Sequence, residues 1–369
     1  MGANLKQIAL ESGVSIPTAS RVLRNLLNFA PETKQRVLAA AERLKYRPNL
    51  LVSGIRTGKT STIGVIIPSP DVFFNNVLHG IHDELVAANH VPIVLLTHSD
   101  GELIDRDYEL TQIHMLLDRR VDGIIFRPIN ELVGDSYRSE VMERNIPLTA
   151  IDSETPLTKA DFVGTDDIFG AKLCAEHLLS LGHRHVAHLA GPSNVSTARD
   201  RWSGFEAAIA KGGGTCITLE ALSYVEDLTT AIQLLESNPR PTAIFASSDP
   251  LAESAYQAAS MLRLKIPEDL SVVGYSDLDI AHRLSPPLTT VHQNPYQIGQ
   301  SAARLVMNRS LGKVTPSRPV KVRLKPELVV RSSTAQPASD RHQRRHSGCL
   351  SDRAGKKRLV VPKKKRDIA

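Results

Sequence analysis

Residues 5–25 of this 369-residue chain have the sequence LKQIALESGVSIPTASRVLRN, in which two short stretches with helical spacing of apolar residues flank a Gly13-Val14-Ser15 turn. Asn4 is a suitable N-cap for the first helix, and Gly13 can end that helix in the left-handed conformation. Ser15 can cap the second helix, whose first turn tolerates Pro17 because its N–H groups lack intrahelical partners. The residues expected to face inward are Leu5, Ile8, Ala9, Leu10, Ala19, Val22 and Leu23. The pattern predicts a helix-turn-helix, whose second helix enters the major groove of DNA.

An ordinary helical hairpin is the alternative that the spacing alone leaves open. Charge favours DNA binding, because residues 1–60 contain ten Lys/Arg and three Glu, a net charge of +7. A small segment this basic is typical of a domain that contacts phosphates. On the second helix, the side chains left for DNA are those of Ile16, Pro17, Thr18, Ser20, Arg21 and Arg24.

The total charge of +6 hides an uneven distribution. Residues 335–369 have a net charge of +8, so residues 61–334 carry −9, and the acidic body is not expected to bind nucleic acid. The three cysteines, Cys174, Cys216 and Cys349, provide no disulfide framework and indicate a reducing compartment. The N-terminus has no signal-peptide h-region, and no segment reaches the roughly 18–20 apolar residues of a membrane span. The sequence therefore predicts a soluble cytoplasmic protein with no membrane partner.

After the second helix, Pro31 opens a third helix that is expected to extend to about Lys45. Its expected core residues are Val37, Leu38, Ala41 and Leu44. Residues 49–55 form an apolar run too short to be a stable helix in water, and residues 56–61 are expected to be a linker. Gly58-Lys59-Thr60 is similar to the end of a phosphate-binding loop, but the glycine that this pattern needs at position 53 is a serine, so nucleotide binding is not expected.

Apolar strands and amphipathic helices alternate from Thr62 onward. The first expected strands are residues 63–67, 91–96, 122–126 and 148–151, and the first expected helices are 77–88, 107–117 and about 137–144. The pattern then restarts, with strands at 162–163, 186–189, 217–222, 243–246, 272–275, 288–292 and 320–324 and helices at 168–181, 198–211, 228–236, 251–262 and 296–311. Such alternation predicts an α/β body of two doubly wound parallel-sheet lobes, with a ligand at the carboxyl ends of the strands.

These patterns divide the chain into four parts: a helix-turn-helix domain (1–46), a hinge and linker (47–61), a two-lobed domain (62–334) and a tail (335–369). The first lobe is expected to contain about 62–161 and 291–320, and the second about 162–290 and 321–334. The tail has the composition of a disordered segment and no leucine heptads. Its lysine run at 363–365 either adds non-specific attraction to DNA or belongs to a solvated tail without function.

Head, linker and body together resemble the LacI/GalR family of bacterial transcriptional regulators over about residues 4–334. The motifs that carry the resemblance are, in order, GVSIPTASRVL, RVLAAAERLKYRPN, RTGKTSTIGVIIP, DVFFNNVLHGI, RRVDGII, VGTDD, HLLSLGHRHVAHLAGP, STARDRWSGF, PTAIFASSD, IPEDLSVVGYSD and LSPPLTTVHQNPYQIG. The body is also similar to periplasmic sugar-binding proteins, a reading that the head and the missing signal peptide argue against. The resemblance implies a homodimeric DNA-binding regulator, expected to be a repressor, with a carbohydrate-like effector between two periplasmic-binding-protein-like lobes.

The resemblance also places the early residues of the second helix against DNA bases. Ile16 and Pro17 have no hydrogen-bonding side chain, so an apolar contact, for instance with a thymine methyl, is expected there, and Arg21 is the best donor to a guanine. Phosphate contacts are expected from Lys6, Arg24 and Lys34. Residues 49–55 match a hinge helix that wedges an apolar side chain into the minor groove, with Ile55 at the wedge position. The predicted DNA-binding set is completed by Ser15, Thr18, Ser20, Asn25, Leu51 and Val52.

In the body, the resemblance implies that Phe73 and Phe74 stack on a ligand ring. It further implies that Asp152 takes ligand hydroxyls and that Arg201 binds two ligand oxygens. The predicted effector-binding set also contains Asp71, Arg127, Ser248, Asp249, Ser276 and Gln293.

Two positions depart from the family pattern. Ser248, followed by Asp249, stands in the place of an asparagine, and Ser276, followed by Asp277, stands in the place of a ligand carboxylate. A pocket that loses a carboxylate and keeps its arginines suits an effector with anionic character, such as a sugar acid or sugar phosphate. A neutral sugar held through serines and water is an equal alternative.

Catalytic signatures are not found. The sequence has no G-x-S-x-G motif, and His183, His185 and His188 lack flanking ligands at metal-site spacing, so no enzyme, metal or cofactor is expected. The expected mechanism is a coupling free energy between effector and operator, with two heads on half-sites about one helical turn apart. An alternative from another class is a cytoplasmic sugar-binding module whose head contacts protein rather than DNA.

Overall fold

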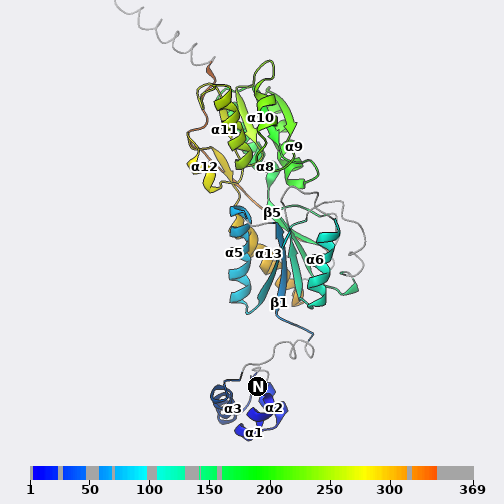
Figure 1. Cartoon of the computed structure of the whole chain (residues 1–369). Coiled ribbons are helices and arrows are strands. Elements are labelled where there is room, and N and C mark those ends of the chain that lie inside the picture. Colours follow the sequence, from blue (N-terminus) through cyan, green and yellow to red (C-terminus); the bar gives the residue numbers. More distant parts are fainter. Residues whose placement is uncertain are drawn as a thin grey trace, which may run out of the picture. The chain divides into compact units, whose positions relative to one another are not determined.

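Figure 1 shows the computed structural model of the chain, which describes residues 3–23, 28–46, 58–68, 71–97, 106–128, 141, 143–155, 160–313 and 318–338. Contacts divide the chain into two compact units, Met1–Ser61 and Thr62–Ala369. No helix of the described residues combines the length and the apolar character that crossing a membrane requires.

The described residues of the first unit form the helices α1 (Leu5–Ser12), α2 (Ile16–Leu23) and α3 (Pro31–Arg43). Asn4 and Gln7 form a capping box at the start of α1, and Gly13 ends α1 in the left-handed conformation at φ 65° and ψ 35°. The buried core of the unit consists of Ile8, Ala9, Ala19, Val22, Val37 and Ala40. The helix-turn-helix prediction is therefore confirmed in its geometry.

Two residues predicted for this small core face solvent instead. Leu10 is 85% exposed and Leu38 is 45% exposed, while Ala40 is buried. Three short helices enclose only a narrow core, so each helix buries only the residues on the stripe that faces its neighbours.

The first lobe of the second unit is built on a six-stranded parallel sheet with the order β11-β5-β4-β3-β1-β2. Its strands are β1 (Thr62–Pro68), β2 (Val91–Thr97), β3 (Gly123–Phe126), β4 (Leu148–Ile151), β5 (Asp161–Thr165) and β11 (Lys321–Leu324). Helices α5 (Val72–Ala87) and α13 (Pro295–Ser310) cover one face, and α6 (Arg106–Asp118) covers the other (Figure 1). Side chains on both faces of the inner strands β1, β3, β4 and β5 are consequently buried, as in other parallel sheets, whereas the outer strands β2 and β11 are partly exposed.

Helices α5 and α13 cross at two glycines. A Cβ atom on Gly80 would overlap the backbone of Tyr296, and a Cβ atom on Gly299 would overlap the backbone of Val77. The two backbones can approach this closely only because neither position has a side chain. This close crossing holds α5, the helix that begins at the cavity described below, against α13.

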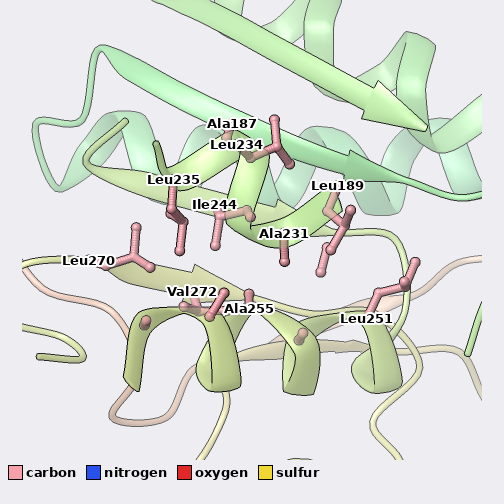
Figure 2. Packing of buried hydrophobic residues seen from close by; sticks show 14 of the residues in the cluster. Ala187, Leu189, Ala231, Leu234, Leu235, Ile244, Leu251, Ala255, Leu270 and Val272 are labelled. Atoms are coloured by element: carbon pink, nitrogen blue, oxygen red, sulfur yellow. The ribbon is translucent and has the colours of Figure 1, made fainter. Parts of the chain in front are cut away.

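The second lobe has a four-stranded parallel sheet with the order β7-β6-β8-β9. Its strands are β6 (His185–Ala190), β7 (Thr215–Glu220), β8 (Ala243–Ala246) and β9 (Ser271–Val273). Its helices are α8 (Asp167–Ser180), α9 (Ser196–Lys211), α10 (Leu228–Leu235), α11 (Asp249–Met261) and α12 (Asp279–Arg283). Figure 2 shows how Ala231, Leu234 and Leu235 of α10 and Leu251 and Ala255 of α11 pack with the strand residues Ala187, Leu189, Ile244 and Val272 and with Leu270. A short antiparallel pair, β10 (Thr290–His292) with β12 (Glu327–Val329), completes the unit.

The structure corrects the predicted lobe boundaries. Strands β5 and β11 were assigned to the second lobe, but both belong to the sheet of the first, because β5 pairs with β4 and β11 pairs with β5. Alternation along the chain gives the kind of each element but does not specify which sheet a strand joins.

The two-lobed domain was predicted to end at residue 334, but its contacts extend further along the chain. The backbone N–H of Ala335 donates to Ser271 Oγ over 3.0 Å, and its carbonyl accepts from His183 Nε2 over 2.9 Å. These bonds attach the C-terminal segment to the second lobe. The prediction of disorder for 339–369 lies outside the described residues.

Candidate functional site

A cavity of about 100 Å³ in the second unit is lined by residues of both lobes. Nine of the predicted effector-binding residues line it: Asp71, Phe73, Phe74, Arg127, Asp152, Arg201, Ser248, Ser276 and Gln293. Four further lining residues were not predicted: Thr197, Tyr224, Pro250 and Leu278. One water molecule needs about 10–15 Å³ of a cavity, so this cavity has room for several water-sized groups.

The first lobe contributes the ends of its strands and the start of α5. Asp71 caps α5 by accepting from the backbone N–H of Phe74 over 2.7 Å, and burial raises the pKa of the Asp71 carboxyl. Phe73 and Phe74 are edge-to-face with ring centres 5.1 Å apart. The cap begins α5 five residues before the predicted start, which brings both rings to the cavity.

A cation and an anion of the first lobe form a pair in the cavity wall. Arg127, just after β3, donates from Nε to Asp152 Oδ2 over 3.3 Å, and the two side chains are 14% and 12% exposed. Asp152 follows β4 at a left-handed φ of 63°. Both groups therefore lie at carboxyl ends of parallel strands, where open α/β sheets bind ligands.

The second lobe contributes Arg201 of α9. Its Nε donates to Asp167 Oδ1 over 2.8 Å and its Nη1 donates to the Ser247 carbonyl over 2.7 Å. Its Cζ lies 3.9 Å from the ring centre of Tyr275. Two of the five guanidinium N–H donors are thus used within the protein, and the cavity is lined by the same side chain.

Asp167 was missed as a partner of Arg201, although it is the second aspartate of the VGTDD motif. Complete burial raises the pKa of Asp167 to about 6, against the opposing attraction of the Arg201 guanidinium. The carboxyl does not line the cavity, so it acts on a ligand only through Arg201.

Serines and an amide form the remaining polar wall. Ser248 caps α11 and donates to the Tyr224 carbonyl over 2.8 Å. Ser276 Oγ donates to Gln293 Oε1 over 2.9 Å, and Gln293 Nε2 donates to Thr165 Oγ1 over 3.1 Å. These bonds fix the orientation of each side chain, and with it the direction of the hydrogen bonds that it can still form with a ligand.

Asp249 was predicted to bind the effector, and this prediction is wrong, because its carboxylate is buried and does not line the cavity. Its Oδ2 accepts from the backbone N–H of Leu278 over 2.7 Å, and its Oδ1 accepts from Thr290 Oγ1 over 2.5 Å. Burial raises the pKa of Asp249 to about 6. Both carboxylate oxygens are thus taken by the protein itself.

The three clustered histidines have separate surroundings. His183 bonds to Thr242 and Ala335, His185 to Thr215, and the fully buried His188 to Ser247. Burial lowers the pKa of His188 to about 3, so its ring is neutral. Within the described ranges, no three His, Cys, Asp or Glu side chains are arranged to hold a metal ion.

In the first unit, α2 presents the predicted base-contacting face to solvent. Ile16, Pro17 and Arg21 are exposed, whereas Thr18 and Ser20 are half-buried. Ser15 is exposed and caps α2 by accepting from the Thr18 N–H over 3.3 Å. The predicted phosphate contacts Lys6 and Lys34 are exposed. The remaining predicted DNA contacts, Arg24, Asn25, Leu51, Val52 and Ile55, lie outside the described residues.

Comparison with known proteins agrees with both parts of the chain. Residues 4–49 match the family model of bacterial regulatory proteins of the lacI family, and residues 175–334 match the model of a periplasmic binding protein-like domain. The HTH-type transcriptional repressor PurR of Photobacterium profundum is 32% identical over 90% of this chain and 98% of its own length.

Two solved structures extend the comparison. The lac repressor dimer bound to operator and the anti-inducer ONPF is 27% identical, with a TM-score of 0.77 over 91% of this chain and 100% of that chain. A LacI family regulator from Enterococcus faecium with bound ribose is 30% identical, with a TM-score of 0.63 over 74% of this chain and 99% of that chain.

The fold and the relatives define a two-part DNA-binding transcriptional regulator, which is not an enzyme. The chain belongs to the LacI family. As a transcription regulator of that family, it works in the cytoplasm.

Proposed function

We propose that the chain is a homodimeric repressor whose affinity for operator DNA is controlled by a neutral, hydroxylated small molecule in the cavity. The observation that carries the choice of ligand is the pairing of both cavity arginines. Arg127 is paired with Asp152, and Arg201 with Asp167. A sugar acid or a sugar phosphate would have to compete with these carboxylates for the same cations.

Charge in the cavity wall supports the same choice. The lining contains two arginines and two aspartates, Asp71 and Asp152, so it has no excess of positive charge. Ligand hydroxyls can donate to the carboxylates and accept from the guanidinium groups, and such charge-assisted bonds are the stronger ones. The bound ribose in the Enterococcus faecium relative is consistent with a hydroxylated ligand.

The repressor assignment follows the PurR relative, and the dimer follows the lac repressor relative, which is a dimer on its operator. Two heads on a two-fold axis would bind a pseudo-palindromic operator and associate with the nucleoid when bound. The effector would favour one arrangement of the lobes and the operator another, which couples the two sites.

Edge strand β2 supplies a surface for the second copy of the chain. Val94 and Leu96 point to one face of β2 and are 36% and 38% exposed, while Ile93 and Leu95 pack on the core of the first lobe. Val86 at the end of α5 and Val91 at the start of β2 are exposed as well. An apolar edge strand left uncovered favours association, so we assign it to the dimer.

Isothermal titration of the full chain with D-ribose, D-glucose, D-gluconate and D-glucose 6-phosphate tests the ligand chemistry. Binding of a neutral sugar, with no binding of the acid or phosphate, is the expected result. Tight binding of only the anionic compounds would show that an arginine leaves its carboxylate and would overturn the proposal. A gel shift with operator DNA, with and without the bound sugar, then tests whether occupancy of the cavity changes DNA affinity.

A further inference from the structure

The turn after β9 contributes two residues to the cavity wall and turns the residue between them away. Ser276 and Leu278 line the cavity, whereas Asp277 does not. Ser276 has a φ of 123° and Asp277 a φ of 56°, so two consecutive non-glycine residues lie in the left-handed region. Such conformations persist only where the surrounding structure holds them.

Asp277 is held away from the cavity by the C-terminal segment. Its Oδ1 accepts from Arg331 Nη2 over 2.6 Å, and its Oδ2 lies 3.1 Å from His292 Nδ1. Arg331 also donates from Nη1 to the Leu288 carbonyl over 2.8 Å, and its Nη2 lies 3.0 Å from His282 Nε2. The side chains of Asp277 and Arg331 are both 13% exposed, so this pair is largely shielded from solvent.

Leu278 is held in the wall by the other aspartate. Its backbone N–H donates to Asp249 Oδ2, and the Leu278 side chain packs against the apolar cluster that contains Phe73 and Phe74 of the first lobe. Pro250 is a further apolar residue of the same lining. The carboxylates of Asp277 and Asp249 therefore both orient the turn, and neither of them faces a ligand in the cavity.

The one hydroxyl of the turn is already committed. Ser276 Oγ gives its proton to Gln293, which leaves only acceptor capacity toward the cavity. A ligand hydroxyl placed against Leu278 would lose its water and find no partner, which is unfavourable. Of the four charged lining groups, Asp71, Arg127 and Asp152 belong to the first lobe, and Arg201 belongs to the second.

We propose that the turn 276–278 determines ligand specificity, and that the effector is a sugar with one apolar edge, a deoxy carbon or a methyl group, which lies against Leu278. Its hydroxyls then bond to Asp71, Arg127 and Asp152. Asp277, Arg331 and Asp249 are positioning residues, since they act on the ligand through the turn. This inference rests on the proposed function, because it specifies the ligand of the same cavity.

Matched pairs of sugars that differ by one hydroxyl test the inference by isothermal titration of the full chain. Suitable pairs are D-galactose with 6-deoxy-D-galactose, D-glucose with 6-deoxy-D-glucose, and D-ribose with 2-deoxy-D-ribose. In at least one pair, the deoxy member is expected to bind about 10-fold more tightly, because the other member leaves a hydroxyl without a hydrogen-bond partner against Leu278. Tighter binding of the fully hydroxylated member in every pair that binds overturns the inference and leaves the proposed function intact. Absence of binding by every sugar of the panel overturns both.

Three variants separate a specific role from a merely structural one. Leu278→Asn supplies a hydrogen-bonding group to the wall and is expected to reverse the preference within the pair. Arg331→Met releases Asp277 and is expected to abolish the preference, whereas Arg283→Met, which changes an exposed arginine of α12, keeps it. The ratio of the two affinities is the readout, because a loss of stability alone would weaken both members of a pair equally. An unchanged ratio in both Leu278→Asn and Arg331→Met contradicts the inference.

Discussion

Arg201, which lines the cavity, forms a buried ion pair with Asp167, with Nε of the arginine 2.8 Å from Oδ1 of the aspartate and the two side chains 5% and 3% exposed. The arginine comes from α9 and the aspartate from the start of α8, so the pair joins two helices of the second lobe. A ligand that bonds to Arg201 is therefore connected to the packing of this lobe.

Asp167→Asn should destabilise the protein and weaken effector binding together. The substitution leaves the Arg201 charge buried without its anion, and breaking a buried pair in this way costs about 3–5 kcal/mol. Urea unfolding followed by the fluorescence of the single tryptophan, Trp202 of α9, measures the loss. The matched control on the same helix is Glu176→Gln, whose exposed pair with Lys172 spans 3.5 Å and should contribute less than about 1 kcal/mol. Equal losses in both variants would show that the buried pair has no special role.

Asp249→Asn should change how stability depends on pH. Burial raises the pKa of Asp249 to about 6 in the folded chain, against about 3.9 for an unfolded aspartate. Between about pH 4 and 6 the unfolded chain loses this proton and the folded chain keeps it, so the wild-type stability falls as pH rises. The slope from this one group approaches ~1.4 kcal/mol per pH unit and ends above about pH 6.

The asparagine variant lacks this slope, so its stability relative to wild type should rise from pH 4 to 6 and then stay level. Urea unfolding of both proteins at half-unit pH steps measures the difference. Burial also raises the pKa of Asp167 to about 6, but Asp167 is present in both proteins, so its contribution to the pH dependence cancels in the difference. If the stabilities of the two proteins changed with pH in parallel, Asp249 would have the same pKa in the folded and the unfolded chain, which would contradict the prediction.

Strand and helix positions were predictable because they depend on local patterns. The predicted limits of 148–151 and 243–246 are those of β4 and β8, since each is a short apolar run in a parallel sheet. The sheet to which β5 and β11 belong was not predictable in this way. The strand β5 pairs with β4 across the lobe boundary that the alternation suggested, and β11 pairs with residues of β5 about 160 positions away. The short elements α12 and β12 gave no periodic signal long enough to detect.

The residues of the cavity, too, divide into those that local sequence predicts and those that depend on tertiary packing. Arg201 was predicted from its motif, and Thr197 could have been found with it, since residues four apart lie on one face of a helix. The choice between Ser248 and Asp249 could not be made from sequence. Both begin α11, and the packing of Leu251 and Ala252 on the sheet determines which side chain faces the cavity.

The apolar face of β2 should control assembly. Val94→Lys combined with Leu96→Lys places two charges on the proposed dimer surface, and burying unpaired charges in an interface is costly. We expect size-exclusion chromatography with light scattering to give a dimer for the wild type and a monomer for this variant. Val330→Lys, which changes another exposed valine outside this strand, should remain dimeric. A dimer that persists in the double variant would place the interface elsewhere.

Arg21 and Lys34 should differ in what they contribute to DNA binding, although both are exposed cations of the first unit. Arg21 lies on α2 beside the apolar Ile16 and Pro17, so it is the strongest candidate for a bidentate contact to guanine. Arg21→Ala should cost about 1–3 kcal/mol on an operator selected from random DNA and little on unrelated DNA. Lys34 on α3 is expected to contact phosphate, so Lys34→Ala should weaken both DNAs alike and lower the slope of log K against log salt by about 1. Fluorescence anisotropy at several salt concentrations measures both quantities, with Lys211→Ala in the second unit as the control. If Arg21→Ala weakened both DNAs equally, Arg21 would be a phosphate contact, and sequence specificity would have to come from other residues.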